Sequence, residues 1–77
     1  MTITQVSQAK KVIREWFPGK ANARLRNILR AQLSEALNEK DRTAKVKLGK
    51  GVLFLEGSGD QRVQNFNSEI NNALGLN

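Results

Sequence analysis

Three closely spaced lysines, Lys45, Lys47 and Lys50, are the residues of this sequence best suited to bind an anion. Lys45 and Lys47 are two residues apart, so in an extended chain their side chains would share one face. Lys50 is the middle residue of the turn sequence GKG. A hairpin with lysines on one face and at its tip can lie along a phosphate backbone. Lysines on an exposed strand can equally prevent edge-to-edge pairing, so the pattern is compatible with both roles.

A second basic cluster lies in the helix predicted over about residues 20–39. Arg26 and Arg30 stand one turn apart, and like charges at this spacing destabilise an isolated helix by about 0.2 to 0.5 kcal/mol. The sequence shows no obvious internal partner for them. Because arginine can hold phosphate bidentately, we predict that both contact phosphates. Lys11 and Arg14, in the first predicted helix, form a third and weaker patch.

The glycine-rich stretch GSGDQR, residues 57–62, could in principle cradle a phosphate at the start of a helix. Arg62 takes the place of the third glycine of a dinucleotide fingerprint, and no P-loop lysine follows. Asp60 also puts negative charge where the helix dipole would attract a phosphate. We interpret this stretch as a turn followed by a helix cap.

Composition excludes several kinds of chemistry. The chain has no Cys and no His, which excludes Cys/His zinc sites and Cys or Ser/His nucleophile pairs. The carboxylates are scattered, and Glu35 and Glu39, the pair that helical spacing brings together, are expected at a solvated edge. We predict a protein that is not an enzyme and uses no cofactor or metal.

The charge distribution suggests the kind of partner. The net charge is +6. Residues 1–50 hold twelve basic and four acidic side chains, a net +8, whereas residues 51–77 hold one and three, a net −2. Such asymmetry favours a polyanion, although net charge also keeps a small domain soluble. The absence of a signal-peptide pattern and of a long apolar run predicts a soluble, cytoplasmic protein that does not bind membranes.

The elements that must position these side chains follow from periodicity. Thr2 and Gln5 have capping-box spacing at the start of a first helix, which FPG ends at residues 17–19. Its apolar face comprises Ile3, Val6, Ala9, Ile13, Trp16 and Phe17. The helix over about residues 20–39 buries a stripe of Leu25, Ile28, Leu29, Leu33, Ala36 and Leu37.

The period then changes from 3.6 to 2, which predicts a strand containing Ala44, Val46 and Leu48, with a second strand at residues 52–56. A C-terminal helix follows, ended by Gly75 at the C′ position. Its apolar stripe is Val63, Phe66, Ile70 and Leu74, and its other side carries Gln61, Gln64, Asn65, Asn67, Asn71 and Asn72, for which we favour solvent over a protein partner. The prediction is one small basic domain over residues 1–77, of the α+β class: an αα-hairpin, a two-stranded antiparallel β-hairpin and a C-terminal helix, in the order ααββα.

The segment LSEALNEKDRTAKVKLGKGVLF, residues 33–54, resembles the core of the histone-like HU/IHF DNA-bending proteins. The residues that carry the resemblance are Leu37, Val46, Leu48, Gly49, Gly51 and Phe54. The resemblance implies an intertwined dimer and DNA binding without sequence specificity. The long basic β-arm of that family is absent here, so the resemblance does not imply DNA bending.

Together these features predict a small nucleic-acid-binding accessory or regulatory protein, with DNA favoured over RNA. The alternative is a protein-interaction module, such as an adaptor, inhibitor or small subunit, that binds an acidic protein. A domain of this size has a thin core, which leaves homodimerisation open as a source of stability.

Overall fold

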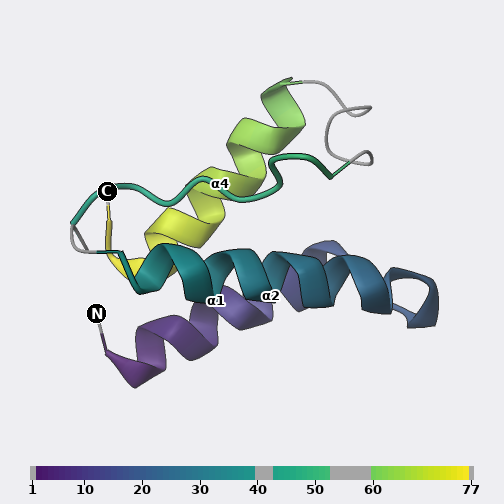
Figure 1. Ribbon diagram of the computed structural model, residues 1–77, viewed down its shortest axis with the longest axis horizontal. Coiled ribbons are helices and arrows are strands. Elements are labelled where there is room, and N and C mark those ends of the chain that lie inside the picture. The colour runs from purple at the N-terminus through teal and green to yellow at the C-terminus, as the bar shows by residue number, and fades with distance from the viewer. Residues whose placement is uncertain (1, 40–42, 53–59, 77) are drawn as a thin grey trace.

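The computed structural model describes residues 2–39, 43–52 and 60–76. In these residues the order of elements is α1 (Ile3–Trp16), the short 3₁₀ helix η1 (Lys20–Asn22), α2 (Ala23–Leu37) and α4 (Asp60–Leu74) (Figure 1). Among them α1 packs most extensively on α4 and less on α2, while the described parts of α2 and α4 make no close backbone contact. The extended segment 43–50 therefore has room to lie between α2 and α4.

The start of α1 is confirmed as a capping box. The Thr2 backbone N–H donates to Gln5 Oε1 at 2.8 Å, and the Gln5 backbone N–H donates to Thr2 Oγ1 at 3.1 Å. These two bonds satisfy backbone donors that the helix itself cannot pair. α1 ends at Trp16, followed by Phe17 and Pro18, as the FPG sequence predicts.

The end of α4 is a Schellman motif, which confirms the prediction for Gly75. Gly75 has a φ of 73°. The Leu76 backbone N–H donates to the Asn71 carbonyl at 2.9 Å, and the Gly75 backbone N–H donates to the Asn72 carbonyl at 3.1 Å. A residue with a side chain would be strained at this φ, so glycine stops the helix here.

The core lies where α1 meets α4 and where α2 and the extended segment close over them. Phe66 packs edge-on against Phe17 and Trp16, with both centroid distances at 5.5 Å. The buried apolar side chains are Ala9, Ile13, Phe17, Leu29, Leu33, Val46, Leu48, Phe66, Ile70 and Leu74. Two predictions of burial are wrong: Ile3 is 88% exposed, and Ile28 is 40% exposed.

The predicted α+β class, with its two-stranded β-hairpin in the order ααββα, is wrong for the described residues, which contain helices but no strand. Residues 45–48 have no regular secondary structure and run alongside α4, with no described strand beside them. The chain then turns at Gly49, whose carbonyl accepts from the Val52 backbone N–H at 3.1 Å. Lys50 and Gly51 are the central residues of this turn, and Gly51 has a φ of 76°.

The geometry of that turn differs from the one that favours a tight hairpin. Two-residue hairpin loops favour turns whose first central residue has a positive φ, whereas here the positive φ falls on the second central residue, Gly51. A positive φ at this position is typical of a type II turn, which splays the flanking chains. Residues 53–56 of the predicted second strand, and the glycine-rich stretch at 57–59, lie outside the described residues.

Candidate nucleic-acid interface

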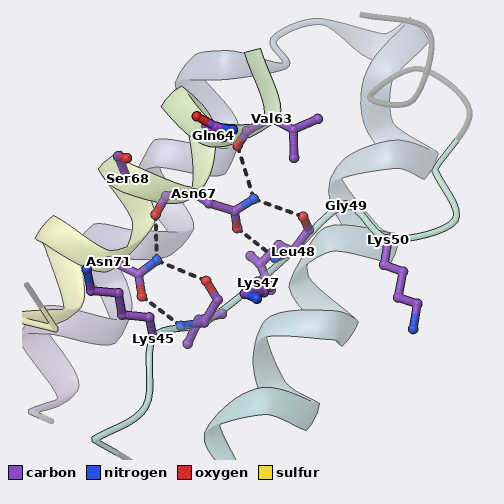
Figure 2. Close-up of a pocket in the computed structure, with 11 residues that line it drawn as sticks. Lys45, Lys47, Leu48, Gly49, Lys50, Val63, Gln64, Asn67, Ser68 and Asn71 are labelled. Carbon is purple, nitrogen blue, oxygen red and sulfur yellow. Dashed lines mark hydrogen bonds between the residues drawn. The ribbon is translucent and has the colours of Figure 1, made fainter. Parts of the chain in front are cut away.

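The segment that carries the three lysines is held along one edge by asparagine side chains of α4 (Figure 2). The Val46 backbone N–H donates to Asn71 Oδ1 at 2.7 Å, and Asn71 Nδ2 donates back to the Val46 carbonyl at 2.9 Å. Leu48 pairs in the same way with Asn67, at 2.7 and 3.2 Å. The two side-chain amides thus bind the segment where a second strand would have bound it. We call this arrangement the asparagine clamp.

The clamp amides are fixed by the helix that carries them. Asn67 Nδ2 also donates to the Val63 carbonyl at 3.0 Å, and Asn71 Nδ2 also donates to the Asn67 carbonyl at 2.7 Å. Asn71 is only 5% exposed. Each amide therefore uses both of its hydrogens, and its orientation is set by α4 as well as by the segment.

The segment is tied to α2 at its other edge. Gln32 Oε1 accepts from the Gly49 backbone N–H at 2.7 Å, and Gln32 Nε2 donates to the Lys50 carbonyl at 3.1 Å. The Val46 and Leu48 side chains point into the core and are 6% and 2% exposed. Because side chains alternate along an extended chain, Lys45 and Lys47 are left exposed on the opposite face.

A groove runs between the segment and α4, with a volume of about 470 Å³. Lys45 and Lys47 border it on the segment side, and Gln64 and Ser68 border it on the α4 side. Lys50 lies at one end and points away from α4 (Figure 2). The structure thus brings together the three lysines that the sequence singles out, and the described α4 residues that border the groove carry no charge.

Acidic side chains lie on the other side of the segment. Glu35 of α2 and Glu39, two residues beyond its end, border a second groove, of about 390 Å³, together with Lys47 and Lys50. Neither lysine forms an ion pair with a carboxylate of the described residues. The two lysines therefore remain available to an anion, and the carboxylates of Glu35 and Glu39 would repel a polyanion from this side of the segment.

Arg26 has the internal partner that the sequence did not reveal. Its Nη1 donates to the carbonyls of Phe17 and Gly19, at 2.7 and 2.6 Å. The guanidinium therefore binds the chain just beyond the C-terminus of α1, where cations are favoured. Arg26 stabilises the turn between two helices, so the prediction that it contacts phosphate is not carried into the proposed interface.

The other predicted basic residues lie apart from the segment or only at its margin. Lys11 pairs with Glu15 on the exposed side of α1, with a distance of 3.9 Å between Nζ and Oε1. Arg14 is exposed on the same helix, and Arg30 is half-buried on α2. Neither Lys11 nor Arg14 lines the grooves that Lys45, Lys47 and Lys50 border. Lys11 and Arg14 therefore do not extend the lysine surface.

Asn67 and Asn71, together with Gln32, are the residues of this site that the sequence analysis missed. Both asparagines belong to the α4 face for which solvent is favoured, and that preference is wrong for them. A signal was present: asparagine is a poor helix former, and here two of them lie one turn apart inside a helix. Trp16, by contrast, packs on Phe17 and Phe66, and its Nε1 donates to Glu69 Oε2, so it is not a base-stacking platform.

No protein-family model, curated protein or solved structure matches this chain. The resemblance to the HU/IHF core therefore depends on its sequence motif and stays a prediction. In the structure Gly49 and Gly51 form the turn of that motif, while Val46 and Leu48 pair with α4 side chains. Phe54 lies outside the described residues.

Two further classes of site are absent from the part of the chain that the structure describes. None of its helices has the length and apolar character needed to cross a membrane. It also contains no cluster of three or more His, Cys, Asp or Glu side chains that could hold a metal ion.

Proposed function

We propose that the protein binds nucleic acid through its phosphates, with Lys45, Lys47 and Lys50 as the contacts, as an accessory or regulatory factor without catalytic activity. The observation that carries the proposal is that the backbone bearing these lysines is held in place by the rest of the protein. They are exposed side chains on a backbone that is hydrogen-bonded to α4 on one edge and to α2 on the other. A segment fixed in this way loses little backbone entropy when it binds.

The spacing of the lysines fits a phosphate chain. Two residues of extended chain advance about 6.6 Å, and each strand of duplex DNA presents one phosphate per 3.4 Å or so of helix axis. Lys45 and Lys47 can thus reach phosphates close together on one strand. Lys50 extends the positive surface at the turn, beyond the end of the groove.

The test is a fluorescence-anisotropy titration of labelled duplex DNA, at about 50 and about 200 mM salt, a range over which phosphate-driven binding changes greatly. The variant replaces Lys45, Lys47 and Lys50 with alanine. The slope of log affinity against log salt should fall by about 0.9 for each phosphate that the variant no longer neutralises.

A charge-matched control separates the segment from net charge. Replacing Lys10, Lys11 and Arg14 of α1 with alanine also removes three positive charges. If the segment is the interface, this control keeps most of the affinity and most of the salt slope. Equal losses of affinity in both triple variants, or no binding by the unchanged protein at the lower salt, contradict the proposal.

One observation favours the second candidate, a module that binds an acidic protein. A groove of about 480 Å³ beside α2 has an apolar floor of Leu25, Ile28 and Val52, and Arg24 and Lys50 border it. Ile28 is 40% exposed there. Apolar surface flanked by cations suits a peptide that alternates apolar and acidic side chains.

That candidate has its own test. A labelled synthetic peptide of alternating Leu and Glu should bind the protein and lose affinity for an Ile28→Asp variant. The same titration with a Leu-Lys peptide is the control for charge. Absence of binding by the acidic peptide contradicts this candidate and leaves the nucleic-acid proposal unaffected. Analytical ultracentrifugation tests the separate prediction of a homodimer.

A further inference from the structure

We propose that the groove between segment 45–50 and α4 receives one unpaired base of the bound nucleic acid, so that the preferred ligand carries unpaired nucleotides instead of a continuous duplex. This inference rests on the proposed function, because the lysines at the rim would hold the phosphates of the same strand. The inference specifies which nucleic acids bind best, because the charge of the lysines alone would not distinguish paired from unpaired strands.

The size and surface of the groove fit a base. Its volume of about 470 Å³ falls within the range of about 300 to 1,000 Å³ that is typical of small-ligand sites. On one side lie Lys45 and Lys47, whose aliphatic stems are apolar even though their ends are charged. Val63 adds apolar surface on the α4 side. A planar ring in the groove would therefore have apolar surface on both sides of it.

The asparagine side chains on the inner side of the groove have no free hydrogen-bond donors. Asn67 and Asn71 lie there, and both amide hydrogens of each are already used within the protein. The two planar amides and the segment backbone that they pair with form a hydrogen-bonded layer (Figure 2). Such a layer suits the face of a base better than it suits a phosphate.

Two polar side chains on the outer wall could recognise the edge of the base. Gln64 and Ser68 stand one turn apart on α4, both are exposed, and neither has a hydrogen-bond partner among the described residues. A glutamine amide offers a donor and an acceptor together, which is the pattern that base edges require. The groove thus combines cations for phosphates with an amide and a hydroxyl for a base.

The aromatic residues explain why we infer one base and not a stacked run of bases. Nonspecific single-strand binders usually stack successive bases on aromatic side chains. In the described part of this chain, Trp16, Phe17 and Phe66 pack on one another at the core. A base inside a duplex cannot enter the groove unless it leaves the stack, so a bulge or a single strand supplies it at the lowest cost.

The experiment compares labelled oligonucleotides of equal length by fluorescence anisotropy at one low salt concentration. The set contains a perfect duplex, the same duplex with one unpaired nucleotide, and the single strand as DNA and as RNA. We expect the ligands with unpaired nucleotides to bind at least about fivefold more tightly than the duplex, the factor that corresponds to one net hydrogen bond. The DNA and RNA arms identify the source of the nucleotide.

Variants on the outer wall connect the preference to the groove. Gln64→Ala with Ser68→Ala should abolish the preference while leaving the duplex affinity and its salt slope unchanged. Ser68→Trp should also abolish it, by filling the groove from an exposed position. The matched control is Asn65→Ala, an exposed α4 residue outside the groove. Circular dichroism checks that each variant keeps its helices.

The outcomes separate this inference from the function on which it rests. Duplex binding as tight as bulge and single-strand binding overturns the inference and leaves phosphate binding intact. A preference that survives both wall variants also overturns it. No binding of any of these ligands at low salt overturns the proposed function and the inference together.

Discussion

Replacing Asn71 with alanine tests the asparagine clamp most directly. The substitution removes the acceptor for the Val46 N–H and the donor to the Val46 carbonyl. Val46 is 6% exposed, so its polar groups gain little access to water. A buried polar group without a partner costs about 1 to 3 kcal/mol. The two Val46 groups together cost about 2 to 6 kcal/mol. Alanine recovers up to about 0.7 kcal/mol through helix propensity, and we expect a net loss of roughly 1 to 5 kcal/mol in the free energy of unfolding.

That loss is large for this chain. A total stability of about 0.05 to 0.15 kcal/mol per residue corresponds to roughly 4 to 12 kcal/mol for a domain of this length. Urea unfolding followed by circular dichroism measures the change, and an unaltered m-value shows that it reflects stability. The control is Asn72→Ala, the exposed neighbour on the same helix, which should change stability by no more than about 0.5 kcal/mol.

Hydrogen exchange gives an independent test of the same clamp. In the unchanged protein the Val46 and Leu48 amide protons should exchange slowly, and those of Lys45 and Lys47 quickly, because only the first two are bound by α4. In Asn71→Ala, Val46 should lose protection first. Equal stability of the Asn71→Ala and Asn72→Ala variants, or uniform exchange along residues 45–48, would refute the clamp.

Three further substitutions test other features of the structure. Gly75→Ala should cost about 1 to 2 kcal/mol, because alanine is strained at the left-handed φ of this position, while the end of the Gln5 side chain can move away from the added Cβ; urea unfolding measures the loss. Arg26→Ala should cost about 1.5 to 3 kcal/mol because it removes both hydrogen bonds to carbonyls, with Arg26→Lys recovering only part of this in the same assay. Glu39→Gln should raise duplex DNA affinity by up to about fivefold, whereas Glu15→Gln on α1 should leave anisotropy titrations nearly unchanged.

The helices and their ends can be predicted from this sequence because they depend on local chemistry. Thr2 and Gln5 form the capping box at the predicted start of α1, and Gly75 ends α4 in the predicted Schellman motif. Each of these motifs is built from residues within five positions of one another. Their geometry does not depend on how the rest of the chain packs.

The hairpin could not be predicted correctly, because alternation shows which side chains are buried and not what the backbone pairs with. Val46 and Leu48 do alternate with exposed lysines, as the sequence predicts. Their backbone partners are Asn67 and Asn71, about twenty residues further on. An asparagine stripe on a helix has the same pattern whether it meets water or a backbone.

In the candidate site, too, local features could be predicted from the sequence and long-range contacts could not. The exposure of Lys45 and Lys47 follows from the two-residue period and that of Lys50 from its place in the turn, and the structure confirms all three. The role of Arg26 does not follow from its own helix, because the carbonyls that it binds belong to the turn after α1. Charges can be counted from a sequence, but their partners depend on the path of the chain.

The length of chain that the asparagine clamp can hold is limited, because an α-helix and an extended chain repeat at different distances. Four residues of α-helix rise about 6.0 Å, whereas two residues of extended chain advance about 6.6 Å. A helix also rotates by about 40° beyond a full turn every four residues. Successive side-chain amides therefore lose register with the segment and rotate away from it. A third asparagine, one turn further along the helix, would not reach the backbone groups of the segment. The sequence agrees, since the position one turn before Asn67 is Val63, and the chain turns away at Gly49. A helix can hold an extended strand in this way for only a short length, which here is enough to present Lys45 and Lys47.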